Sequence, residues 1–237
     1  MGNSIKAHIE HAEKTGVCQL SSMNLSEFPS QVLKLSKSLR TLDLSDNKIQ
    51  GIPEAIGNFT SLKTLTLNHN RLSILCSSIC KLKKLEHLSV THNRLAYLPP
   101  DLGECAALKT VVLTGNHFQS VPEQMATLKH LDLLDMSHNK ITRIPENLHQ
   151  LNAVELILNN NQIPSLPDCL ASCPRLKVLR FQENCVPLDG ISKKILLDSK
   201  ISLLVFDGNL FTQKDFQQVE GYSQYMERYT ATKKKFE

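Results

Sequence analysis

A motif that recurs about every 23 residues constrains the fold of this 237-residue chain more than any other feature. The motif L-x-x-L-x-L-x-x-N-x-L is met by Leu39, Leu42, Leu44, Asn47 and Ile49, and seven more copies follow. One asparagine marks each copy, at spacings of 22 to 25 residues: Asn47, Asn70, Asn93, Asn116, Asn139, Asn161, Asn184 and Asn209. A fixed period of this length is the signature of a solenoid, in which each repeat forms one coil and packs against its neighbours.

The two halves of each repeat carry different patterns. The L-x-L alternation has the period of a short strand. The second half, Ile-Pro-x-x-Ile-x-x-Phe-x-x-Leu from Ile52 to Leu62, has a spacing of three that suits a 3₁₀ or loose helical turn. The sequence therefore predicts an α/β solenoid with a parallel β-sheet on its concave face and 3₁₀ or loop return segments. A degenerate ninth copy precedes the others, with Met23 in the place of the asparagine.

The repeated asparagines suit a structural role. An asparagine amide has both donors and an acceptor, so it can satisfy backbone groups that are left unpaired where a strand turns into a loop. We expect the eight asparagines to form a structural ladder along the solenoid.

Composition and charge argue against several classes of function. The net charge of +4 is spread along the chain among acidic residues, so no basic block favours nucleic acid. No apolar run approaches the roughly 18 residues that can span a bilayer. The seven cysteines, together with first residues that lack an apolar stretch, favour a reducing compartment with free thiols.

An open solenoid needs a cap at each end, because its outermost coils would otherwise expose apolar faces. Near the start of the chain, Ile5, Ile9 and Ala12 lie on one stripe of a predicted helix that Gly16 can end. We therefore expect residues 1–16 to hold a capping helix and residues 17–211 to form the repeat domain.

The C-terminal residues 212–237 are the second predicted cap, followed by a basic tail. Residues 212–215 resemble a capping box, and apolar residues at spacings of three and four follow at Phe216, Val219, Tyr222, Met226 and Tyr229. We expect one helix over residues 213–229 that can break at Gly221. Binding of a partner is the alternative role of this helix.

The repeats resemble those of intracellular leucine-rich repeat proteins of the short L-P-x-x-I class. Pairs such as Leu98-Pro99 and Ile144-Pro145 carry the class pattern, and the resemblance covers residues 15–211. The Met-Gly-Asn-Ser start and the tail after residue 224 are similar to those of one branch of this family. The resemblance implies a horseshoe-shaped, non-catalytic scaffold or adaptor that binds a protein partner in intracellular signal transduction. The alternative is a regulatory or accessory subunit of an enzyme: a phosphatase, a small GTPase or a ubiquitin ligase complex.

Binding in solenoids commonly uses the concave surface, where the outward-pointing residues of successive strands form columns. Val112, Leu133, Ile157 and Val178 are apolar at such positions, and exposed apolar side chains on neighbouring strands are typical of interfaces. The alternative is that these residues are simply good strand formers. The predicted partner-binding residues are Thr64, Thr66, His87, Ser89, Val112, Leu133, Asp135, Glu155, Ile157, Val178 and Arg180.

Gly2 is the candidate site of lipidation. After removal of Met1 it is the acceptor that N-myristoylation requires, and Asn3 and Ser4 suit the start of that motif, whereas Lys6 stands where the motif has Ser or Thr. The related proteins are thought to begin with a lipidated glycine, and an ordinary processed or acetylated terminus is the alternative. We expect the chain to divide between the cytosol and the cytoplasmic face of a membrane, held there by the myristoyl group.

Histidines and cysteines are the remaining candidates for chemistry. His69, His92 and His138 share a column at the strand ends, but Gly115 interrupts it and no third ligand of suitable geometry joins a pair. We expect surface histidines and no metal.

The cysteines of this chain are expected to be structural. Cys105 and Cys173 occupy a repeat position that Leu82 and Leu128 fill elsewhere, so we expect them to be buried apolar residues. The sequence has no phosphate-binding glycine loop, nucleophile elbow or paired-carboxylate motif. We therefore expect no catalytic residues and no cofactor, and a monomer whose partner is a protein and not a nucleic acid.

Overall fold

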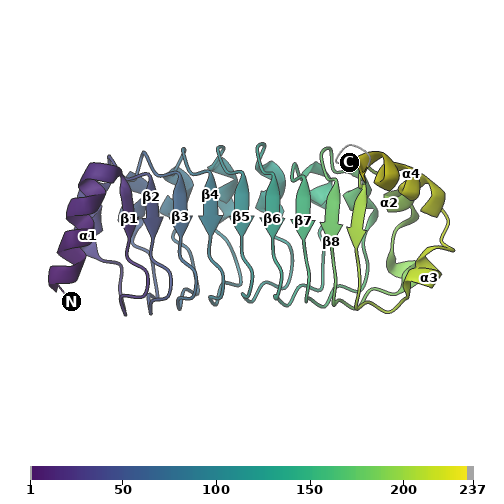
Figure 1. Ribbon diagram of the computed structural model, residues 1–237, viewed down its shortest axis with the longest axis horizontal. Coiled ribbons are helices and arrows are strands. Elements are labelled where there is room, and N and C mark those ends of the chain that lie inside the picture. Colours follow the sequence, from purple (N-terminus) through teal and green to yellow (C-terminus); the bar gives the residue numbers. More distant parts are fainter. Residues whose placement is uncertain (1, 234–237) are drawn as a thin grey trace. The chain divides into compact units, whose positions relative to one another are not determined.

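The computed structural model describes residues 2–233, with side chains from residue 5 to residue 233. By compactness the chain divides into two units, residues up to 117 and residues from 118 onward. Within each unit, every coil consists of a three-residue strand, a turn and a short helical return segment (Figure 1). The predicted solenoid with parallel strands and 3₁₀ return segments is confirmed.

The first unit begins with a helix and contains five strands within its described residues. Helix α1 spans Gly2–Thr15. The strands are β1 (Val17–Gln19), β2 (Thr41–Asp43), β3 (Thr64–Thr66), β4 (His87–Ser89) and β5 (Thr110–Val112), and they pair in parallel in chain order. The 3₁₀ helices between them are η1 (Ser30–Leu35), η2 (Glu54–Asn58), η3 (Ser77–Lys81) and η4 (Pro100–Glu104).

The second unit has four parallel strands, also paired in chain order. They are β6 (Leu133–Asp135), β7 (Glu155–Ile157), β8 (Val178–Arg180) and β9 (Leu203–Val205). The 3₁₀ helices are η5 (Glu123–Thr127), η6 (Glu146–Gln150), η7 (Asp168–Ser172) and η8 (Leu188–Gly190), and the α-helices are α2 (Lys193–Leu197), α3 (Gln213–Phe216) and α4 (Tyr222–Lys233).

The middle residue of each strand points into the core, and its two neighbours point outward. In β3, Leu65 is completely buried, whereas Thr64 and Thr66 are half-buried. In-register pairing stacks Leu42, Leu65 and Leu88 in one column. Each such leucine contributes about 2 kcal/mol through burial, so the repeated leucines are the main stabilising element of each coil.

The return segments begin at a residue with a fixed, extended backbone. Proline precedes most of the 3₁₀ helices, with φ of −70° at Pro53 and −65° at Pro122. This is the angle that the pyrrolidine ring imposes, so proline fits the position without strain. At η3, Cys76 takes the same place with φ of −68°.

The N-terminal cap agrees with the prediction. Ile5, Ile9 and Ala12 are buried, and α1 packs against β1 and η1 (Figure 1). The helix ends at Gly16, whose φ of +71° is in the left-handed region that favours glycine.

The C-terminal cap was predicted in part. The side chain of Thr212 accepts a hydrogen bond from the backbone of Asp215, and the Asp215 carboxylate accepts one from the backbone of Thr212, so the capping box is confirmed. The predicted break at Gly221 is confirmed, since α4 begins directly after this residue, whose φ is +91°. The predicted bounds differ from those observed, because α3 already ends at residue 216 and α4 continues to residue 233. The break shifts the helical phase, so that Tyr225 is the buried residue of α4.

Helix α2 was not predicted. It replaces part of the last return segment, where the spacing between Asn184 and Asn209 widens to 25 residues. Among the described residues, no helix combines the length and apolar character that crossing a bilayer would require.

Candidate protein-binding surface

In the first unit, the predicted binding residues form two columns across neighbouring strands. Thr64 pairs in register with His87, and Thr66 pairs with Ser89, which in turn pairs with Val112. His87 is exposed and the others are half-buried. This part of the sheet therefore presents hydroxyl groups and one imidazole, with Val112 as its apolar member.

In the second unit, the same columns are apolar and charged. Leu133, Glu155, Val178 and Leu203 form one column, and each side chain is half-buried. The second column holds, likewise half-buried, Asp135, Ile157, Arg180 and Val205.

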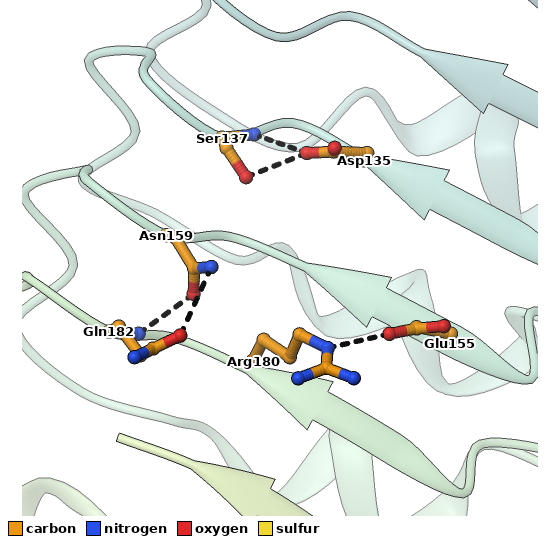
Figure 2. A network of polar contacts seen from close by, with 6 residues as sticks. All are labelled: Asp135, Ser137, Glu155, Asn159, Arg180 and Gln182. Carbon is orange, nitrogen blue, oxygen red and sulfur yellow. Dashed lines mark hydrogen bonds and ion pairs between the residues drawn. The ribbon is translucent and has the colours of Figure 1, made fainter. Parts of the chain in front are cut away.

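The charged residues of the two columns in the second unit, Asp135, Glu155 and Arg180, all have polar partners. Nε of Arg180 donates to the Glu155 carboxylate at 2.6 Å, from the neighbouring strand (Figure 2). The Asp135 carboxylate accepts hydrogen bonds from the backbone and hydroxyl of Ser137, at 2.9 and 2.7 Å. These partners leave the apolar side chains as the main groups free to contact a partner protein.

The polar contacts continue past the strand ends. Oδ1 of Asn159 accepts a hydrogen bond from the backbone of Gln182 at 2.9 Å, as Figure 2 shows. In the first unit, Oδ1 of Asn68 similarly accepts from the backbone of Thr91 and the hydroxyl of Ser89, both at 2.8 Å. Such bonds between neighbouring coils hold the candidate surface in a fixed register.

We define the apolar strip of the second unit as the five half-buried residues Leu133, Ile157, Val178, Leu203 and Val205. The last two line a pocket of about 320 Å³ that β9 forms with α3 and α4. Its other walls are Leu204, Phe206, Gln213, Phe216, Tyr222, Tyr225, Met226 and Tyr229. The site prediction did not include this pocket, because the phase of α4 after its break at Gly221 cannot be obtained from a helical pattern drawn through the break.

Hydrogen bonds hold α4, which forms one wall of the pocket, in place. The backbone N–H of Leu204 in β9 donates to the Tyr225 hydroxyl at 3.1 Å, and burial raises the pKa of this phenol. Arg228 donates to the carbonyl oxygens of Ile195, Leu196 and Ile201, at 2.7 to 3.1 Å. Helix α4 is thereby fastened both to β9 and to the end of α2.

The eight predicted ladder asparagines lie at the turn after a strand and link neighbouring coils. In Asn70, Nδ2 donates to the carbonyl oxygen of Leu44 in the preceding coil and Oδ1 accepts from the backbone of Ile49, both at 2.9 Å. Asn47, Asn93, Asn116, Asn161, Asn184 and Asn209 have equivalent bonds, and Asn139 accepts from the backbone of Phe118 at 3.1 Å. All but Asn209, which is half-buried, are buried.

The remaining candidate residues are Gly2 and the histidines. Gly2 is the first residue of α1. The rings of His69 and His92 stack with centroids 4.4 Å apart, and no group of three or more possible metal ligands occurs between residues 5 and 233.

Most thiols in the described part of the chain are buried. Cys105 and Cys173 are 0% and 2% exposed, so their prediction as apolar core residues is confirmed. Burial raises the pKa of each to about 12, which disfavours the reactive thiolate.

The parallel strands, the 3₁₀ return segments and the asparagine turns define the class: leucine-rich-repeat solenoids. The sequence model of the family described as "Leucine rich repeat" matches residues 19–72, 37–95 and 106–163. Because these matches cover more than half of the chain, the chain belongs to this family.

A curated relative is the plant intracellular Ras-group-related LRR protein 7 of Oryza sativa subsp. japonica. It is 33% identical over 61 residues, which are 26% of this chain and 23% of the relative. The chain thus matches about a quarter of that protein's length.

Three solved structures with the same fold have longer chains than this one. An internalin of Listeria monocytogenes has a TM-score of 0.68 at 19% identity, over 84% of this chain and 55% of its own, and shows the fold alone. The PEPR1-AtPEP1 structure has a TM-score of 0.60 at 29% identity, over 73% and 25% of the two chains. The ectodomain of the receptor kinase GASSHO1/SCHENGEN3 of Arabidopsis thaliana, in complex with CASPARIAN STRIP INTEGRITY FACTOR 2, has a TM-score of 0.52 at 25% identity, over 77% and 31%.

Proposed function

We propose that this chain is a non-catalytic scaffold or adaptor that binds a protein partner through the concave face of its second unit. The observation that carries the proposal is the apolar strip, whose neighbouring charges Glu155 and Arg180 are paired with each other. A partner that covers the strip therefore buries apolar surface beside a charge pair, and the other carboxylate of these columns, Asp135, already accepts hydrogen bonds from Ser137. The pocket beside β9 supplies a concave site for one anchoring side chain, as interface hot spots commonly require.

The solved structures support this proposal. Two of them, PEPR1-AtPEP1 and the ectodomain in complex with CASPARIAN STRIP INTEGRITY FACTOR 2, are described as complexes or pairs of this fold with a second component. Solenoids generally bind through the extended surface that repetition creates.

The second candidate is a regulatory or accessory subunit of an enzyme. The name of the rice relative contains "Ras-group-related", which favours a small GTPase among the enzymes considered, with a phosphatase and a ubiquitin ligase complex as the others. Identification of the partner distinguishes a plain adaptor from such a subunit.

We also propose a nearer relative, a lipid anchor and a cellular location. Within the family, the repeat number and the two chain ends resemble leucine-rich-repeat-containing protein fifty-seven. We propose a monomer with a myristoylated Gly2, present in the cytosol and on the cytoplasmic face of a membrane, with a role in signal transduction. Its functional segments are 1–16, 17–211 and 212–237, and the first and last of these extend beyond the described residues.

The proposal is tested by two variants, each of which adds one positive charge to a different face of two neighbouring coils. Ile157→Arg places the charge in the apolar strip, and Gln150→Arg places it on the exposed end of η6 as the matched control. Proteins that co-purify with each variant from cells are quantified by mass spectrometry. We expect Ile157→Arg to reduce the specific partners by about tenfold or more, since charge in a desolvated hot spot is costly, and Gln150→Arg to retain them.

Two outcomes would contradict the proposal. Retention of the same partners by folded Ile157→Arg would place the interface elsewhere. If Val112→Arg removes the partners while Ile157→Arg does not, the interface lies in the first unit.

A further inference from the structure

A second exposed surface lies at the turns of the first unit, away from the strand columns. Ile74 and Tyr97 are 68% and 81% exposed and are two of three large apolar side chains in the described residues that are so open to solvent. They occupy the same repeat position, 23 residues apart, in successive coils. Single exposed apolar residues are ordinary, but two that recur at one position of adjacent coils form a patch.

The backbone fixes these two coils side by side at this place. The backbone N–H of Arg94 donates to the carbonyl oxygen of Leu72 at 2.8 Å, and that of Leu72 donates to Oδ1 of Asn93 at 2.9 Å. The corresponding bond one coil earlier joins Arg71 to Ile49 at 2.9 Å. Neighbouring coils are therefore about 4.8 Å apart here, close enough for one side chain of a partner to contact both Ile74 and Tyr97.

Three cations accompany the patch. Lys48, Arg71 and Arg94 follow the ladder asparagine in successive coils, and all are exposed. Residues 48–52, 71–75 and 94–98 include no acidic residue. In the described residues, no carboxylate lies within ion-pair distance of these cations, whereas Lys63 and Lys109 both pair with Glu86, at 3.0 and 2.7 Å.

The patch is also open on one flank. Gly51 holds the position of Ile74 in the preceding coil, and a β-carbon placed there would meet nothing within 4 Å. The space beside Ile74 is therefore open at the position where the preceding coil would otherwise place a side chain. We name these residues the basic loop surface: Lys48, Gly51, Arg71, Ile74, Arg94 and Tyr97.

We propose that the basic loop surface binds an acidic peptide segment of a protein, in which carboxylates flank an aromatic or aliphatic side chain. The carboxylates pair with Arg71 and Arg94, and the apolar side chain covers Ile74 and Tyr97. Arginine suits this role because its planar guanidinium binds a carboxylate through two parallel hydrogen bonds. The surface is independent of the apolar strip, so either interface can fail without the other.

The test is a selection of displayed random dodecapeptides on the full chain, with counter-selection on Arg71→Glu/Arg94→Glu. We expect enriched peptides to combine Asp or Glu with Phe, Leu or a similar side chain. Fluorescence anisotropy then measures the affinity of each synthesised peptide. Affinity should fall by about tenfold or more in Arg71→Glu/Arg94→Glu and in Ile74→Ser/Tyr97→Ser, and it should fall with added salt because the charges are exposed.

The control variant uses the same repeat positions in the second unit. Lys140→Glu/Gln162→Glu changes the residues equivalent to Arg71 and Arg94 and should leave affinity unchanged. Gly51→Trp is a further test in the first unit: it places a large side chain beside Ile74, where a β-carbon meets nothing within 4 Å, and should weaken binding, with a thermal melt to check that the variant is folded.

Three results would overturn the proposal. One is enrichment only of peptides that lack carboxylates or that bind Arg71→Glu/Arg94→Glu equally well. Another is equal binding of polyglutamate, which would show attraction by charge alone. The third is binding of phosphatidylserine vesicles through Arg71 and Arg94 when no peptide binds, which would make the surface a membrane contact.

Discussion

At the residue scale, the turn after each strand depends on two neighbouring positions with different requirements. The ladder asparagine supplies donors and an acceptor to two coils. The residue before it adopts a positive φ, as His69 does at 51° and Glu183 at 52°. The sequence pattern predicted where the asparagines lie, because one side chain type suits the position. It did not predict the positive φ at this position, since most residues other than glycine adopt that conformation rarely and Glu183 has no preference for it, although histidine adopts it more often than most residues do.

The first prediction at this scale concerns Asn116, which is 3% exposed. Its amide donates to the carbonyl oxygen of Val90 at 2.8 Å and accepts from the backbone of Leu95 at 3.0 Å. Asn116→Ala leaves both buried groups without these partners, which should lower the free energy of unfolding by about 2 kcal/mol or more. A urea melt measures the loss.

His117→Ala is the control for Asn116→Ala, because the adjacent His117 side chain is exposed. Its urea midpoint should stay near that of the wild type. Equal midpoints for both variants would show that the asparagine bonds do not stabilise the coil.

At the element scale, periodicity predicts repeated parts of the fold better than parts that occur once. The strands and 3₁₀ helices recur, so eight copies of the pattern reinforce one another. Helix α2 occurs once and leaves as its signals only a wider asparagine spacing and Ser192, whose hydroxyl accepts from the backbone of Lys194 at 3.3 Å. The pocket beside β9 was missed for the same reason, since it depends on α4 and its break at Gly221.

The prediction at the element scale is that the C-terminal cap, residues 213–237, stabilises the last coil. Removal of residues 213–237 eliminates the hydrogen bond between β9 and Tyr225 and the three hydrogen bonds that Arg228 donates to carbonyl oxygens. It also exposes the ring of Phe206, which packs against Phe216. We expect a lower thermal midpoint and self-association, because an uncapped coil exposes apolar surface and an open strand edge. Light scattering with a thermal melt measures both effects.

Removal of residues 234–237 alone is the matched control, because it leaves α4 complete. Arg228→Met separates the effect of one side chain, and we expect it to lower the free energy of unfolding by about 2 kcal/mol, because the carbonyl oxygens lose the hydrogen bonds that Arg228 donates. A truncated protein that stays monodisperse with an unchanged midpoint would show that residues 213–237 do not cap the repeats.

At the scale of the whole molecule, repetition determines the fold without determining the partner. The leucines and asparagines that define the family lie inside the coils, whereas the candidate binding residues lie at positions that the repeat leaves free to vary. Sequence therefore predicted which columns face outward. It could not predict that Glu155 and Arg180 pair with each other, because both are free to take other rotamers and only their geometry across two strands decides the contact.

The last prediction is that Gly2 directs a weak and reversible association with membranes. A single myristoyl chain gives a partition constant of only about 10⁴ M⁻¹, so stable residence needs a second signal. Helix α1 supplies little, because Lys6 lies 3.9 Å from Glu10 in an exposed pair and Lys14 follows Glu13. In the basic cluster of residues 233–235, only Lys233 belongs to the described residues, as the end of α4.

Fractionation of cells that express wild type or Gly2→Ala tests the anchor, with an alkynyl myristate label to report acylation. We expect wild type to be labelled and divided between membrane and cytosol, and Gly2→Ala to be unlabelled and absent from the membrane fraction. Equal membrane fractions without label would disprove the lipid anchor. Complete retention of the wild type in the membrane fraction at high salt would contradict the prediction of weak association, because one myristoyl chain with few unopposed charges beside it cannot bind the membrane so firmly.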